Sequence, residues 1–241
     1  MVCGMTSTSP VSEFEKSSIK TSLRTVNLHG RAGQLEGLLN EGGQDSRFCG
    51  LVCHPHPLGG GTMHNKVVYH AMKVLNAPEW DLRWPVLRFN FRGTGLSEGQ
   101  HDGLAESADV ITAIDWLQAE YKLPVILVGF SFGAAMSIKA SCASDSSSTV
   151  SNLRALVSLG LPTQGFGQTY HYPVLANCAL PKLFLSGDSD MFAPQQDLRK
   201  VVDHAADPKQ LVFVAGADHF FRGRLEAMQK ELARWLKENV Q

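Results

Sequence analysis

The sequence predicts a single α/β domain: a mostly parallel β-sheet with helices on both faces and an antiparallel hairpin at its N-terminal end. After residue 48, short apolar runs alternate with longer segments of helical periodicity, which is the pattern of a parallel sheet with crossover helices. Two alternating segments precede this region, and alternation is typical of a hairpin with one face buried. The length of 241 residues suits one domain of this class.

The predicted elements follow one another along the chain. The hairpin pairs Ile19–Leu28 with Gln34–Asn40 around a turn at His29–Gly33. The further strands are Phe48–Cys53, Val86–Phe91, Val125–Gly129, Ala155–Leu159, Lys182–Ser186 and Gln210–Val214. The helices are Asn65–Asn76, Ala105–Tyr121, Ser131–Ala143 and Arg224–Asn239. We expect a flexible tail over residues 1–17, the domain over residues 18–241, and a surface loop at Ser144–Thr149.

Composition and charge exclude several classes of protein. Hydrophobic residues make up 44% and charged residues 19%, with a net charge of −1, so neither disorder nor general attraction to nucleic acid is expected. No run approaches the ~18 apolar residues of a membrane span, and the N-terminal residues lack the apolar core of a secretory signal. We therefore expect a cytoplasmic protein that neither binds nucleic acid nor inserts into membranes. The oligomeric state is left open.

The five cysteines do not suggest a disulfide framework, because their number is odd and they form no close pairs. Cys49 and Cys53 fall on one face of a predicted strand. We expect buried free thiols in a reducing compartment.

The strongest local motif is Gly129-Phe130-Ser131-Phe132-Gly133, between a buried strand and a helix. A serine on such a sharp turn is held in strained backbone geometry with its hydroxyl exposed, and the flanking glycines relieve crowding. The amide of Phe132 then points towards the reacting oxygen. We therefore predict that Ser131 is a nucleophile.

An acid and a histidine are expected after later strands. Asp188 and Asp190 both follow Lys182–Ser186. Asp188 lies at the strand end, where it caps the turn, whereas Asp190 reaches across the edge of the sheet, so Asp190 is the predicted acid. His219 follows the last strand and precedes the last helix, which makes it the predicted base. Neighbouring Asp218 is expected to be a cap.

A second donor to the reacting oxygen is expected from the loop that begins His54-Pro55-His56-Pro57-Leu58. The prolines have no N–H, which leaves His56 or Leu58, and we favour Leu58 because the glycines after it let the backbone turn inward. A metal site built from His54, His56 and His64 is disfavoured, because no matching acid or second His-x-His accompanies them. We expect no cofactor.

Together these motifs resemble the α/β-hydrolase superfamily: HPHPLGGGTMHNKVV, NFRGTGLSEG, GFSFGAA, LSGDSDMF and AGADHFF occur in that family's order over most of the chain. The opening HPHP segment resembles the small hydrolases near the dienelactone-hydrolase-like branch. The resemblance implies a Ser131–His219–Asp190 triad and an oxyanion hole formed by the amides of Phe132 and Leu58. Dienelactone hydrolases proper carry a cysteine nucleophile, so the serine here favours ordinary esters.

The segment between Pro162 and Pro181 is too short for the large cap that many members insert there. Its aromatic residues Phe166, Tyr170 and Tyr172 would roof a pocket for small or flat acyl groups. The predicted function is that of a carboxylesterase acting on small-molecule esters through an acyl-serine. A thioesterase or acyl-peptidase would use the same groups, and a non-catalytic binding member of the fold is the other alternative.

Overall fold

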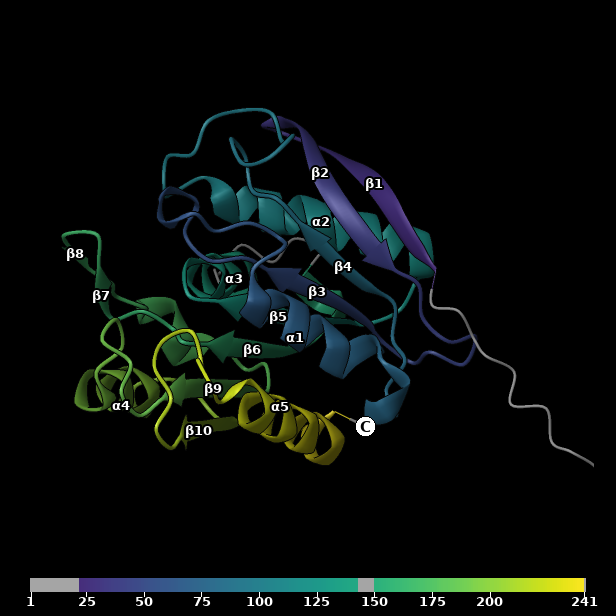
Figure 1. The fold of residues 1–241 in the computed structure, drawn as a ribbon. Helices are drawn as coiled ribbons and strands as arrows, with labels where there is room; N and C mark the ends of the chain where they lie inside the picture. The colour runs from purple at the N-terminus through teal and green to yellow at the C-terminus, as the bar shows by residue number, and fades with distance from the viewer. Residues whose placement is uncertain (1–21, 143–149, 241) are drawn as a thin grey trace, which may run out of the picture.

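The computed structural model describes residues 22–142 and 150–240 (Figure 1). The expected tail over residues 1–17 and the predicted Ser144–Thr149 loop lie outside the described residues. Eight strands form one sheet in the order β1-β2-β4-β3-β5-β6-β9-β10. The predicted fold class is confirmed: β1 and β2 form an antiparallel hairpin, β2 pairs antiparallel with β4, and every pair from β4 to β10 is parallel.

The strands of this sheet lie close to the predicted runs. Four of them, β3, β4, β5 and β9, are buried at every position, so their apolar runs stand out in the sequence. They are β1 (Leu23–Gly30), β2 (Gly33–Asn40), β3 (Cys49–Cys53), β4 (Val86–Phe89), β5 (Val125–Phe130), β6 (Leu153–Leu159), β9 (Lys182–Gly187) and β10 (Lys209–Val214). A separate two-stranded sheet pairs β7 (Gln164–Gly165) with β8 (Gln168–Thr169).

Helices cover both faces of the large sheet (Figure 1). On one face, α1 (Lys66–Asn76) packs beside α5 (Leu225–Asn239), and their apolar residues share a core with Val52, Ile126 and Leu183. On the other face, α2 (Glu106–Tyr121) packs beside α3 (Phe132–Cys142) over a second core that includes Leu51 and Leu127. Neighbouring residues of one strand thus point to opposite cores, as the pleat requires.

One helix that the sequence analysis did not predict, α4 (Gln195–Asp203), follows β9. This helix is short, and only Leu198 and Val202 are buried. Two buried apolar residues are too few to reveal a helical period in the sequence. Four 3₁₀ turns complete the described elements: η1 (Pro57–Gly59), η2 (Pro78–Trp80), η3 (Val150–Asn152) and η4 (Pro173–Asn177).

The cysteines correct one expectation. Cys49 and Cys53 are buried free thiols as predicted, and burial raises the pKa of each to about 12. However, Cys142 at the end of α3 forms a disulfide with Cys178, just after η4. The two are 36 residues apart in sequence, yet their Cα atoms lie 5.0 Å apart. Only the packing of η4 against α3 brings them together, so their spacing could not reveal the pair.

Within residues 22–142 and 150–240, no helix combines the length and apolar character needed to span a bilayer.

Candidate active site

Ser131 occupies the turn between β5 and α3 with a φ of +56°, a left-handed conformation that a residue with a side chain adopts only when its surroundings impose it. Its amide is held by the carbonyl of Leu159 on the neighbouring strand, at 2.9 Å. A Cβ on Gly129 would lie 2.4 Å from the Ala134 backbone, and one on Gly133 would lie 2.5 Å from the Cys53 carbonyl. Both glycines of the motif are therefore required by close approach of the chain.

His219 and Asp190 converge on this serine from neighbouring loops. The Nε2 of His219 lies 2.9 Å from Ser131 Oγ, and its Nδ1 lies 2.8 Å from Asp190 Oδ2. Asp190 is 3% exposed, and its carboxylate also accepts hydrogen bonds from the Ser186 hydroxyl and from two backbone amides of the following turn. The acid is thus fixed on both oxygens, and it holds the imidazole with one nitrogen facing the serine.

The structure separates the two competing acids. Asp188 accepts hydrogen bonds from the Gly216 amide, at 3.0 Å, and from the Ser189 hydroxyl. The Gly216 hydrogen bond is the main reason that the pKa of Asp188 is lowered. Asp188 therefore ties the loop after β9 to the loop after β10. Asp218 accepts amide hydrogen bonds from Phe220 and Arg222, which is the role of a turn cap.

The two predicted amide donors differ in their surroundings. Phe132 is the first residue of α3, and the first amides of a helix have no acceptor within it. The amide of Leu58 donates instead to the Nδ1 of His56, at 3.2 Å, because His56 caps the η1 turn. The Leu58 side chain is 77% exposed. The expectation that the Leu58 amide points at the serine therefore does not match its observed hydrogen bond.

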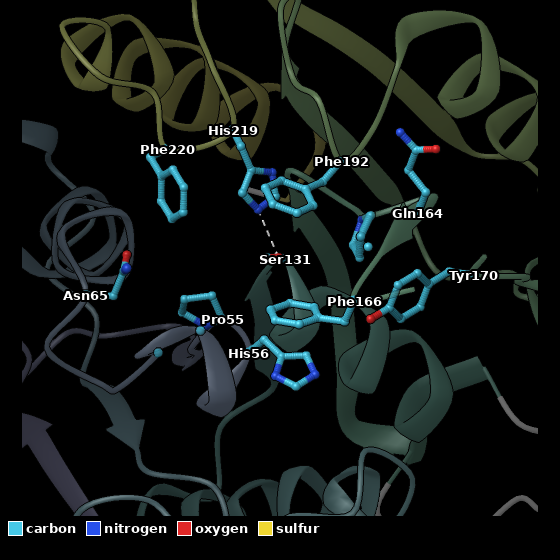
Figure 2. Close-up of a pocket in the computed structure, with 14 residues that line it drawn as sticks. Pro55, His56, Asn65, Ser131, Gln164, Phe166, Tyr170, Phe192, His219 and Phe220 are labelled. Carbon is cyan, nitrogen blue, oxygen red and sulfur yellow. Dashed lines mark hydrogen bonds between the residues drawn. The ribbon is translucent and has the colours of Figure 1, made fainter. Parts of the chain in front are cut away.

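A cavity of about 180 Å³ opens above Ser131. Asn65 and Phe220 lie on one side of the serine, and Gln164 and Tyr170 lie on the other (Figure 2). The described residues that line it are mostly apolar: Pro55, His56, Gly59, Gly61, Asn65, Ser131, Pro162, Gln164, Gly165, Phe166, Tyr170, Phe192, His219 and Phe220.

Of the three aromatic residues predicted to roof the pocket, Phe166 and Tyr170 line this cavity. Tyr172 does not: its hydroxyl donates to the Pro162 carbonyl at 2.6 Å, and it borders a separate surface groove. The sequence analysis missed Asn65, Phe192 and Phe220. Phe192 lies two residues after Asp190, and Phe220 directly follows His219. Their closeness to the predicted acid and base could have identified them as residues that line the pocket.

The histidines of the His54-Pro55-His56 segment have protein partners. His54 is fully buried, donates through Nδ1 to the Pro55 carbonyl and accepts the Phe91 amide at Nε2. Burial lowers the pKa of His54 to about 4. His56 packs on Phe166, and burial lowers its pKa as well. Among the described residues, no three His, Cys, Asp or Glu side chains are grouped as metal ligands.

Comparisons with known proteins show which family and fold this chain shares. Residues 59–240 match the family model described as an alpha/beta hydrolase domain. An uncharacterised protein of Rickettsia prowazekii is 32% identical over 219 residues, which are 88% of this chain and 87% of that protein. The structure of an alpha-beta serine hydrolase homologue from Coxiella burnetii has a TM-score of 0.77 at 34% identity, covering 91% of this chain and all of that one.

A second solved structure is similar over almost the same share of the chain. A serine hydrolase without lid from Xanthomonas campestris has a TM-score of 0.74 at 27% identity, covering 91% of this chain and 95% of that one. The sheet topology, the position of Ser131 and these similarities lead to one conclusion. The chain belongs to the alpha/beta hydrolase family, and its described residues form one domain with the fold of the family's serine hydrolases, in which only β7, β8 and η4 lie between β6 and β9.

Proposed function

We propose that this protein is a carboxylesterase-type serine hydrolase that cleaves small esters through an acyl-serine intermediate. The observation that carries the proposal is the chain of two hydrogen bonds from Ser131 through His219 to Asp190. A nucleophile in contact with a base, which a buried acid orients in turn, is the arrangement that acyl transfer uses.

In the first half-reaction, Ser131 Oγ attacks the ester carbonyl carbon while Nε2 of His219 takes the hydroxyl proton. The tetrahedral intermediate collapses, the bond to the alcohol oxygen breaks, and His219 returns its proton to the leaving alcohol. In the second half-reaction, water attacks the acyl-serine carbonyl while His219 takes a proton from the water. The bond from the acyl carbon to Oγ then breaks, the carboxylic acid leaves, and His219 returns the proton to Ser131 Oγ. Asp190 stabilises the imidazolium that forms in both halves.

The negative charge on the carbonyl oxygen needs two donors, and we assign these to the amides of Phe132 and His56. The Phe132 amide stands at the start of α3, whose dipole also favours an anion. His56 lines the cavity, and no hydrogen bond among the described residues engages its N–H. In this assignment the His56 amide takes the role predicted for the Leu58 amide, which donates to the His56 ring instead.

The size of the cavity supports small substrates. Its volume of about 180 Å³ is below the ~300–1,000 Å³ of typical drug-sized sites. Phe166, Phe192 and Phe220 give it apolar walls, which suit a short or flat acyl group rather than a peptide.

The test is hydrolysis of nitrophenyl esters of increasing acyl length by the wild-type chain and by Ser131→Ala. We expect the highest kcat/KM for the shortest acyl groups and no turnover above background for the variant. A matched set of thioesters and acyl-peptides in the same assay separates the esterase from the two related activities. Equal rates for the wild-type chain and the variant across every substrate would refute the proposal.

A further inference from the structure

The turn from His56 to Gly61 is built around a single residue. The carbonyl of His56 accepts the amides of Gly59 and Gly61, each at 3.0 Å. Its ring nitrogen Nδ1 accepts the amide of Leu58 at 3.2 Å. The amides of Leu58, Gly59 and Gly61 therefore all donate to His56. The amide of Gly60 donates to the Pro57 carbonyl. The N–H of the same residue has no partner among the described hydrogen bonds.

The ring of His56 is held on several sides. Phe166 stacks on it with ring centres 4.1 Å apart, while Phe132 and His101 each approach to 4.8 Å. Figure 2 shows Phe166 lying between Ser131 and the His56 ring. The residue as a whole is 8% exposed. A ring packed this way cannot rotate freely, so the position of Nδ1 is fixed.

We propose that His56 is a positioning residue: its neutral ring caps the η1 turn through the Leu58 amide, and this cap aims the His56 N–H at the reacting oxygen. The inference rests on the proposed function, in which that N–H stabilises the oxyanion. It assigns to the side chain a task distinct from that of the backbone of the same residue. The ring touches no reacting atom and acts only through the turn.

The cap requires a neutral ring, because a protonated Nδ1 carries its own hydrogen and cannot accept one. The charged and titratable groups around the ring are His101, whose Nδ1 lies 2.5 Å from a carboxylate oxygen of buried Glu106, and His54 on the same segment. The aromatic residues Phe132 and Phe166 complete its surroundings. Burial and then the charge of His101 lower the pKa of His56, against the opposing effect of Glu106. The ring therefore stays neutral to a lower pH than an ordinary imidazole does, and the cap is lost only below that range.

Two substitutions separate the ring from the backbone, since both retain the His56 N–H. His56→Ala removes the acceptor, whereas His56→Asn keeps one, because asparagine is a favoured N-cap that accepts the same amide. His64→Ala, at an exposed position nearby, is the matched control for loss of an imidazole. We expect His56→Ala to lower kcat roughly 10- to 100-fold. Complete loss of one oxyanion donor costs ~10²–10³-fold, and this variant misdirects the donor without removing it.

The other variants test the mechanism of this loss. His56→Asn should recover most of the loss in kcat, and KM should stay within about two-fold in both variants because the ring does not bind substrate in the ground state. His64→Ala should behave as wild type. The acid limb of the kcat/KM profile should be steeper in the wild type, where protonation of the His56 ring breaks the cap, than in His56→Asn, whose side chain cannot be protonated.

The Leu58 amide gives a readout that does not depend on activity. In the NMR spectrum of the full chain, its resonance should shift with pH in the wild type, stay constant in His56→Asn, and exchange with solvent fastest in His56→Ala. Wild-type kcat in a folded His56→Ala protein would overturn the inference. Equal loss in both variants would also overturn it, because stacking of the ring, not its cap, would then matter. If the wild type hydrolyses no ester while the Leu58 resonance behaves as expected, the proposed function fails and the cap stands.

Discussion

Asp190 lies 2.8 Å from His219 through Oδ2 and Nδ1, while Asp188, only two residues earlier, binds the Gly216 amide instead. The same loop therefore carries one acid that faces the histidine and one that ties two loops together. Asp190 can face the histidine because the chain turns back after Ser189, and its second oxygen accepts the amides of Phe192 and Ala193.

Substitution of Asp190 should mainly affect activity, whereas substitution of Asp188 should mainly affect stability. Asp190→Asn should lower kcat by up to ~10⁴-fold, as in a protease triad, because the amide no longer holds the imidazole in the productive tautomer. Asp188→Asn should mainly lower Tm, because the link to the Gly216 amide weakens. Ester kinetics and thermal melts of both variants check this. A larger loss of kcat in Asp188→Asn would show that the acids are wrongly assigned.

His54 should make the fold sensitive to acid. Its pKa is about 4 in the folded chain against an ordinary 6.5, so the unfolded chain takes up a proton first. The stability from its neutral form is complete above about pH 6.5 and is lost as the pH falls towards 4, by about 3 kcal/mol in all. Denaturant unfolding should be measured near neutral pH and again near pH 4. Between these two values the free energy of unfolding should fall more in the wild type than in His54→Gln, whose side chain does not titrate. Equal losses in the two proteins would contradict this account.

The disulfide should stabilise the fold without taking part in the chemistry. Cys142 and Cys178 close a loop with a sequence separation of 36, for which chain entropy gives about 3–4 kcal/mol. Cys142→Ser should lower the free energy of unfolding by this order while leaving kcat near the wild-type value below the melting range. Cys49→Ser is the control for a buried thiol outside the disulfide. A wild-type Tm for Cys142→Ser, unchanged by reductant, would show that the bond contributes nothing.

Phe166 should limit the length of the acyl group. It lines the cavity and comes from a turn in which Gly165, Phe166 and Gly167 all have positive φ. Phe166→Ala should raise kcat/KM for longer acyl esters relative to the shortest. Leu96→Ala changes an apolar residue that is also exposed but does not line the cavity, so it should leave that ratio unchanged. An unchanged ratio in Phe166→Ala would remove Phe166 from the selection of substrate.

The sequence identified features whose cause is local. The G-x-S-x-G turn was recognisable because Gly129 and Gly133 are required by close contacts of one strand-to-helix turn. The convergence of His219 and Asp190 on Ser131 could be predicted because parallel strands end at one edge of the sheet. The direction of the Leu58 amide depends on capture by the His56 ring. The Cys142–Cys178 pair depends on packing of η4 against α3. Such tertiary events leave no periodic signal in the chain.

The central claim is that Ser131 is the nucleophile, and a reactive phosphonate tests it most directly. The wild-type chain should gain the mass of one phosphonyl group, and peptide mapping should place it on Ser131. Ser131→Ala, with an unchanged circular dichroism spectrum and Tm, should gain none, because no other serine among the described residues contacts His219. Labelling of another residue in the wild type, or undiminished labelling of Ser131→Ala, would contradict the account.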